Sequence, residues 1–297
     1  MRFIRTTLIG LRKTVTGFGF WVCAGFTVIL CFSANIYTDV IKNDRYSVFS
    51  ALRTFDREFM LNDTSFCSFS VIQRAVSGWL SLFIPIIAAF AFIPLVCDEY
   101  EAKSVRFEIF RAGKRSFHLS RFLTALICGG LAVTVGFAVF SLLAFLLFPG
   151  IGDYGPMQRE MLLESLSFAF PEISSGLTLP MLKIIGSVFL YGAVSAVPAI
   201  ALTAFIRNKY LVLCIPFFLK YAVGQTCLKL QSQAVSDYEH TDEAMMRFAG
   251  IINPDSLAFL PQLGDMKEAV LLYSGGLVLA ALGAYIFIQL RRVDSGE

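Results

Sequence analysis

The chain has 297 residues, of which 56% are hydrophobic and only 16% are charged, and its formal net charge is +3. A soluble domain carries roughly a quarter charged residues, so this composition excludes an ordinary soluble protein and predicts one that crosses a membrane several times. No basic run has interleaved aromatic residues, which argues against a nucleic-acid partner.

Residues 1–13 form an amphipathic segment. Phe3, Ile4 and Leu8 alternate with basic residues such as Arg5 and Arg12, as is typical of a helix lying in a membrane interface. The apolar stretch that follows is longer than the core of a signal peptide and lacks a small-x-small cleavage site, so we expect it to remain as a span.

A helix needs about 20 apolar residues to cross the hydrocarbon layer. Six stretches meet this length, which predicts an all-α membrane protein with one permease-like domain covering residues 1–297. The predicted spans are 17–37, 78–97, 122–148, 184–206, 211–228 and 269–290. The fifth is the weakest, because Lys220 interrupts it and Pro216 bends it.

The distribution of charge predicts the orientation. With the N-terminus inside, the inner segments hold fourteen of the 25 basic residues but only six of the 22 acidic ones, a net charge of +8. The remaining residues carry −5. Cytoplasmic loops are enriched in Lys and Arg, so we expect both termini to be cytoplasmic and the protein to lie in a cell membrane, most simply a bacterial cytoplasmic membrane.

A dense polar block at residues 97–121 separates the second and third predicted spans. Its acids come first and its bases follow, with apolar residues between them. Glu99 and Lys103 form an i, i+4 acid-to-base pair that favours helix. We interpret the block as a short amphipathic helix at the membrane surface, broken near Gly113. An ordinary loop whose bases only set the topology is the alternative.

The predicted outer connections 40–77, 149–183 and 229–268 are all long. Within the last of them, 245–263 is too apolar for a free loop and too short to span the membrane. It is either a re-entrant or interfacial segment or a compact loop packed on the outer ends of the helices.

Seven cysteines are present without CxxC spacing, which argues against a zinc or redox motif. Most fall in apolar runs and are expected to act as small buried hydrophobes. Cys67 lies in a polar loop, so a disulfide with Cys227 is a second interpretation.

Motifs for catalysis in this chain are absent. The sequence has no HExxH, no GxSxG and no phosphate-binding GxxxxGK[ST], so we expect no enzyme activity, no metal and no bound cofactor.

Lys220 is the only ionisable residue inside a predicted span, and such residues often mark a transport pathway. Lys220 and Gln225 are therefore candidates for a cargo pathway. The alternative is that Lys220 extends toward the membrane surface or caps a backbone carbonyl.

The polar block resembles the cytoplasmic loop of ABC-2 type permeases, the membrane subunits of one class of ABC exporter. That loop carries an acid, a Gly-Thr, a helical stretch, a Ser-Arg and a closing Ser-Lys. Glu99 matches the acid and Ser104 the Thr, while Gly113-Lys114 and Ser120-Arg121 match the two later pairs. Lys103 replaces the usual Gly, and the Pro that precedes the Ser-Arg is missing.

The resemblance implies a permease that pairs with a second permease, identical or different, and with two ATP-binding cassette subunits that bind ATP and Mg²⁺. It also implies that the 98–118 helix docks on the ATPase and that the 207–209 turn makes a smaller contact. The candidate coupling residues are Glu99, Glu101, Ser104, Arg106, Arg111, Lys114, Arg207 and Lys209. The expected cargo is amphipathic or hydrophobic: a peptide, a lipid-like molecule or a drug.

The competing interpretation from another class is an ion-coupled secondary transporter or channel that uses Lys220. Paired intramembrane charges or inverted repeats would favour it, and the sequence shows neither.

Overall fold

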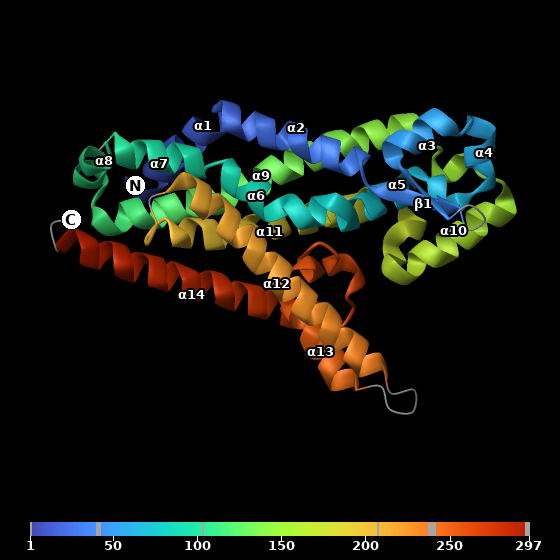
Figure 1. The fold of residues 1–297 in the computed structure, drawn as a ribbon. Coiled ribbons are helices and arrows are strands. Elements are labelled where there is room, and N and C mark those ends of the chain that lie inside the picture. Colours follow the sequence, from blue (N-terminus) through green and yellow to red (C-terminus); the bar gives the residue numbers. More distant parts are fainter. Residues whose placement is uncertain (1, 40–42, 103, 207, 237–241, 295–297) are drawn as a thin grey trace.

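The computed structural model describes residues 2–39, 43–102, 104–206, 208–236 and 242–294. Long helices dominate the fold and lie side by side, as Figure 1 shows. The start of the first helix and the end of the last lie at the same end of this bundle, and we call it the inner end. The longest helices are α9 (Lys114–Leu147), α14 (Met266–Asp294), α12 (Lys209–Ser236) and α11 (Thr178–Leu202).

Five helical segments in the described part of the chain are long and apolar enough to cross a membrane. They are Ser68–Glu101, Lys114–Asp153, Thr178–Leu202, Lys209–Val235 and Met266–Arg291. Each contains or closely overlaps one of the predicted spans. The segment at the fifth predicted span is the least apolar of these five, as expected, although α12 continues through Pro216 for 28 residues.

The first predicted span, 17–37, is longer than the helix found there. Helix α2 (Phe18–Phe32) has 15 residues and therefore rises only about 22 Å, less than the roughly 30 Å of hydrocarbon. Helix α1 (Arg2–Val15) precedes it at a bend of 60°, and the two make a sixth apolar segment only if they are counted together. The expected amphipathic helix at the start of the chain is present as α1.

The second apolar segment is a chain of four helical pieces: α5 (Ser68–Ala75), η2 (Val76–Leu80), α6 (Ser81–Phe90) and α7 (Ile93–Glu101). η2 is a π-helical turn in which Gly78 departs from helical geometry. π-Turns inside α-helices often lie at functional sites, and here the turn directly precedes Ser81.

The middle of the polar block folds as helix α8 (Val105–Ala112), while its first residues end α7 and its last ones begin α9, so 98–118 is not one continuous helix. Gly113 follows α8 with φ of +84°. The positive φ favours glycine, so the predicted break at this position is confirmed. The loop alternative for the block is therefore wrong for residues 105–112.

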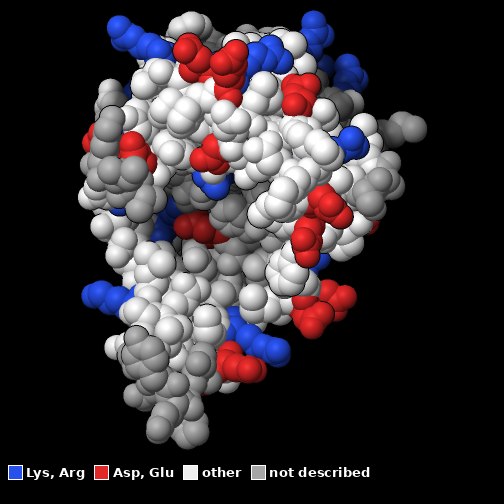
Figure 2. All heavy atoms as spheres, turned by 90° about the vertical axis from the view of Figure 1, so that its right-hand side faces the viewer, with Lys and Arg blue, Asp and Glu red and all other residues white. Residues whose placement is uncertain are grey.

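The opposite end of the molecule, the outer end, carries the short elements. Strands β1 (Asn35–Asp39) and β2 (Asp44–Ser47) form an antiparallel hairpin, so the fold is mainly but not entirely helical. Figure 2 looks onto this end and shows acidic and basic side chains spread around a largely uncharged surface. The other elements here are α3 (Val48–Thr54), α4 (Arg57–Asn62), η1 (Thr64–Phe66), η3 (Ile151–Asp153), α10 (Pro156–Ala169) and η4 (Pro171–Ser175).

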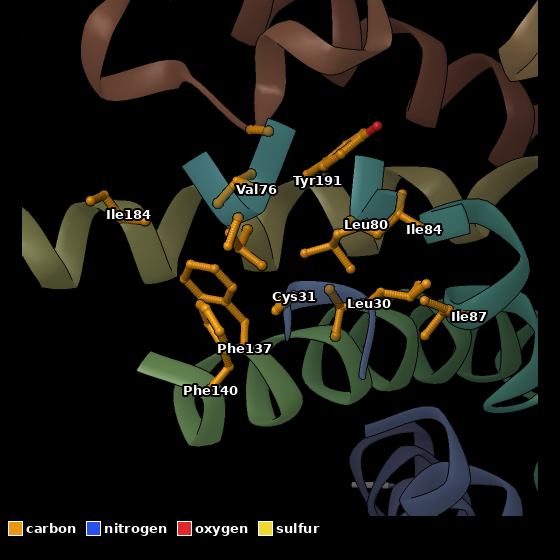
Figure 3. Packing of buried hydrophobic residues seen from close by; sticks show 14 of the residues in the cluster. Leu30, Cys31, Val76, Leu80, Ile84, Ile87, Phe137, Phe140, Ile184 and Tyr191 are labelled. Carbon is orange, nitrogen blue, oxygen red and sulfur yellow. The ribbon is translucent and has the colours of Figure 1, made fainter. Parts of the chain in front are cut away.

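The core lies where α2, α6 and α11 pack around α9. Figure 3 shows the apolar layer between them, with Leu30 of α2, Leu80 at the start of α6 and Phe137 of α9 pointing inward. Glycines allow the backbones to approach closely: a Cβ atom at Gly136 would lie 2.3 Å from the carbonyl oxygen of Ala24. Helix α9 is thus in direct backbone contact with α2.

Residues 245–263 are folded and lie between α12 and α14. They comprise most of α13 (Glu243–Ile252), then η5 (Pro254–Leu257) and η6 (Leu260–Gln262). Asp255 of η5 reaches residues near the middle of α11 and α12, as described below. This geometry favours the inserted segment over a loop resting on the outer helix ends.

All seven cysteines have free thiols, and only Cys214 is exposed. The proposed disulfide between Cys67 and Cys227 is therefore not formed. Burial raises the pKa of the Cys67 thiol, which keeps it protonated and unreactive.

Candidate functional site

Lys220 lies at the centre of a buried polar cluster. Its side chain is 10% exposed, and its Nζ atom lies 2.9 Å from Oδ1 of Asp255. The same Nζ donates hydrogen bonds to the carbonyl oxygen and the hydroxyl of Ser81, at 2.5 and 3.0 Å. The cluster therefore joins α12, α6 and η5, which are far apart in the chain.

Pro85 explains why Lys220 points at Ser81. In an uninterrupted helix the carbonyl of Ser81 would accept a hydrogen bond from the N–H four residues later, but that residue is Pro85 and has no N–H. The carbonyl is left free inside the bundle, where an unpaired polar group is costly. Lys220 supplies the missing donor, and the hydroxyl of Tyr191 also lies 3.2 Å from this carbonyl, although its one proton points to Asp255 at the shorter distance.

Asp255 is held by three donors from three helices. Its Oδ1 accepts hydrogen bonds from the Tyr191 hydroxyl at 2.5 Å and from the Ser81 hydroxyl at 2.7 Å, besides its contact with Lys220. Burial alone raises the pKa of this carboxyl, but the positive charge of Lys220 and the hydrogen bonds outweigh it. The pKa of Asp255 therefore lies below its usual value, which favours the ionised carboxylate.

Local sequence places Asp255 at this position. Asn253 caps η5 by accepting the backbone N–H of Asp255 at 3.1 Å, and Pro254 opens the turn with its φ already fixed. Tyr191 is fully buried, and Figure 3 shows its hydroxyl directed away from the apolar layer. The turn and the tyrosine together present a carboxylate to Lys220.

A cavity of about 280 Å³ opens beside this cluster. Its wall is mainly apolar and comes from α6, α11, α12, α13, η5 and α14, with Lys220 and Tyr191 at the polar side. Three of its residues are the helix-interior prolines Pro85, Pro198 and Pro216. Such a cavity suits an apolar ligand that carries one polar group.

Of the two residues predicted for a cargo pathway, only Lys220 lines this cavity. Gln225 is exposed on α12 and does not line it. The alternative for Lys220 is correct in one respect, because the side chain does cap a backbone carbonyl. The sequence analysis missed Asp255, and the signal that could have found it was an acid directly after Asn-Pro in an apolar segment.

At the inner end, α8 stands out from the bundle. Only Val105 of this helix is buried, while Phe107 and Phe110 are 81% and 95% exposed. Arg106 and Arg111 are exposed as well. A helix that presents two bare phenylalanines beside arginines has the composition of a protein contact surface.

Glu99 lies near α8, and its side chain points toward other helices of the bundle. It pairs with Lys13 of α1 and with Arg121 of α9, and its side chain is 14% exposed. The guanidinium of Arg121 also lies over the ring of Tyr100, 5.0 Å from its centroid. Glu99 therefore links α1, α7 and α9 and holds these three helices in position relative to one another.

Two of the other candidate coupling residues contact the end of α7. The Ser104 hydroxyl donates to the carbonyl of Glu99 at 3.2 Å and so helps to end α7. Lys209 at the start of α12 lies 3.7 Å from Asp98, which brings the two predicted contact regions together. Glu101 and Lys114 are exposed at the surface. Arg207, like Lys103 in the predicted pair with Glu99, lies outside the described residues.

No group of three or more His, Cys, Asp or Glu side chains in the described part of the chain is placed to hold a metal ion. Comparison with models of known protein families gives no match, and the curated proteins give none either. The function is therefore argued from the residues and their geometry.

Proposed function

We propose that this chain is the permease subunit of an ATP-driven exporter of the ABC-2 type, with ATP hydrolysis on separate subunits. The observation that carries the proposal is α8, a short helix at the inner end that exposes two phenylalanines and two arginines. The proposed partners are two ATP-binding cassette subunits, which bind ATP and Mg²⁺, and a second permease subunit.

The position of α8 suits the transfer of movement. Gly113 joins it to α9, whose 34 residues extend roughly 51 Å toward the outer end. Glu99 ties α7 to α9 and to α1. A partner that shifts α8 would therefore act on three helices at once. ATP binding to that partner supplies the difference in free energy between inward-facing and outward-facing states.

The cavity beside Lys220 supports an amphipathic or hydrophobic cargo, such as a peptide, a lipid-like molecule or a drug. Its wall is mainly apolar, while Lys220 offers a positive charge to a single polar group. The long apolar helices support a membrane protein. Placement in a bacterial cytoplasmic membrane with both termini inside belongs to the proposal.

The experiment that tests the proposal is purification of the tagged chain from membranes of its native host, followed by identification of co-purifying proteins. Wild type is compared with Phe107→Ser/Phe110→Ser and with Phe49→Ser/Phe168→Ser, which alters two exposed phenylalanines at the outer end. We expect an ATPase with a P-loop to co-purify with wild type and with the outer variant only, and ATP hydrolysis to follow it.

Recovery of the wild-type chain without any ATPase would contradict the proposal. A second readout uses Glu99→Lys, for which we expect ATP hydrolysis to continue without transport. Unchanged transport in Glu99→Lys would remove Glu99 from the coupling pathway.

One observation favours a second function, an ion-coupled secondary transporter or channel. Lys220 is not alone, because Asp255 supplies the acid that such a pathway requires. This alternative predicts uptake or efflux in vesicles that carry a proton or sodium gradient but no ATP. It also predicts that Lys220→Met abolishes this flux, whereas the Phe107→Ser/Phe110→Ser variant retains it.

A further inference from the structure

A second cavity, of about 490 Å³, lies at the inner end between α1, α7, α8 and α9. It is separate from the cavity at Lys220 and shares no residue with it. The function proposed above makes no use of it.

The lining of this cavity carries unpaired positive charge. Arg5 of α1 and Arg111 of α8 line it from different elements, and neither forms a hydrogen bond or an ion pair with another described residue. Lys13 and Arg121 also line it, but Glu99 neutralises part of their charge. With Glu108 included, the lining holds four basic and two acidic side chains. The excess favours an anion.

Buried polar groups in the same wall lack partners. Thr124 is 8% exposed, and its hydroxyl forms no hydrogen bond. Arg121 is also 8% exposed, and its Nη1 atom is unpaired as well. Buried polar groups without a partner are rare, because each one costs free energy. Both atoms lie just behind the cavity surface, so an oxygen-rich ligand would supply acceptors here once these two side chains turn toward it.

Most of the remaining wall is apolar and includes Ile9, Phe92 and Leu95. Helix α1, which covers the cavity, exposes Ile4 and Leu8 at 62% and 59% on its surface. An amphipathic helix with bare apolar side chains lies in the membrane interface, where headgroups and the first carbons of acyl chains meet. The ligand that matches both halves of this cavity is therefore a lipid.

We propose that this cavity binds an anionic phospholipid, with the phosphate between Arg5 and Arg111 and an acyl chain along Ile9, Phe92 and Leu95. The lipid would bridge α1 to α8 at the point where Glu99 already ties α1 to α7 and α9. The proposal does not rest on the function proposed above, because lipid binding needs no ATPase and no cargo.

The test is native mass spectrometry of the full chain in detergent with added phosphatidylglycerol or phosphatidylcholine. Each basic residue near an anionic lipid surface strengthens the binding of that lipid. Two arginines together are expected to favour the anionic lipid over the zwitterionic one by about tenfold or more. We expect wild type to prefer phosphatidylglycerol by that factor. We expect Arg5→Gln/Arg111→Gln to lose the preference and the outer-end control Arg45→Gln/Arg53→Gln to keep it.

A second variant tests the shape of the cavity. Ile9→Trp keeps all charges but fills the apolar part, and we expect it to weaken binding of phosphatidylglycerol. Far-ultraviolet circular dichroism checks that each variant is folded. Equal preference in the Arg5/Arg111 variant and wild type would overturn the proposal. So would displacement of phosphatidylglycerol by millimolar inorganic phosphate, since that result assigns the cavity to a soluble anion.

Discussion

Lys220 and Asp255 form an ion pair, 2.9 Å from Nζ to Oδ1, between the middle of a long helix and a turn inserted from the following connection. The turn meets α11 at Tyr191, about 20 Å along that helix from Thr178. The pair thus fixes the depth at which residues 254–257 enter the bundle.

Removing the charge of Lys220 is expected to destabilise the protein. In Lys220→Met the carboxylate of Asp255 and the carbonyl of Ser81 each lose a donor, and a broken buried pair costs about 3–5 kcal/mol. Because Asp255 is 32% exposed, we expect a smaller loss, about 2–3 kcal/mol in the free energy of unfolding, measured in denaturing detergent. Lys229→Met on the same helix, where the side chain is exposed, should change the free energy of unfolding by less than about 0.5 kcal/mol.

The contribution of Asp255 is expected to depend on pH. Its pKa is lower in the folded state than in the unfolded state, so the stabilisation is complete above about pH 5 and is lost as the pH falls through the folded value, below about 4. The measurement compares wild type with Asp255→Asn between pH 7 and pH 3. A difference in stability that stayed constant across this range would show that the carboxylate charge contributes nothing.

Glu99 is expected to hold α1 against the bundle. Glu99→Gln removes the charge that Lys13 and Arg121 share, which leaves Arg121, 8% exposed, without its counter-ion. We expect a loss of about 1–2 kcal/mol and faster cleavage of α1 by trypsin. Glu101→Gln is the matched control, because Glu101 is exposed two residues later. Equal cleavage rates in the two variants would contradict this role.

Exposed phenylalanines on α8 are expected to contribute to binding and not to folding. Phe110→Ser should leave the unfolding free energy of the isolated chain within about 0.5 kcal/mol of wild type, because the ring is 95% exposed. Val105→Asp on the same helix places a charge in a buried position and should prevent normal folding. A large loss of stability in Phe110→Ser would mean that α8 packs differently.

Gly136 is expected to tolerate no side chain. A Cβ atom there would lie 2.3 Å from the backbone oxygen of Ala24, so Gly136→Ala must push α2 away from α9. Overpacking of this kind costs about 1–3 kcal/mol, measured by unfolding in denaturing detergent. Gly283→Ala on α14 meets open space and should be neutral or slightly stabilising. Similar effects of the two substitutions would contradict the close approach.

Hydropathy predicted the helices well because the length of an apolar run is a local property. It failed at residues 35–37, where the predicted span runs into strand β1 and the strand signal of a few residues is weak. The break at Gly113 was predictable, since glycine after a helical stretch is a local signal.

Tertiary partners were not predictable in the same way. Sequence spacing paired Glu99 with Lys103, but its described partners are Lys13 and Arg121 from other helices. Lys220 was recognised as costly in a membrane, yet its counter-ion comes from a connection that periodicity assigns to the outer surface. Periodicity identifies which residues share a face and does not show which faces meet.

The glycines of α9 have a consequence for how the molecule can move. Gly129 and Gly130 of α9 meet α11 and Gly136 meets α2, so α9 approaches both helices closely and the three form a stiff slab. By contrast, the apolar stretches of α12 and α14 are mostly exposed and are not covered by other helices. The cavity at Lys220 takes its walls from both parts and lies along the seam between them. A swing of α12–α14 against the slab is therefore the motion that disturbs the least packing, and it would open that seam.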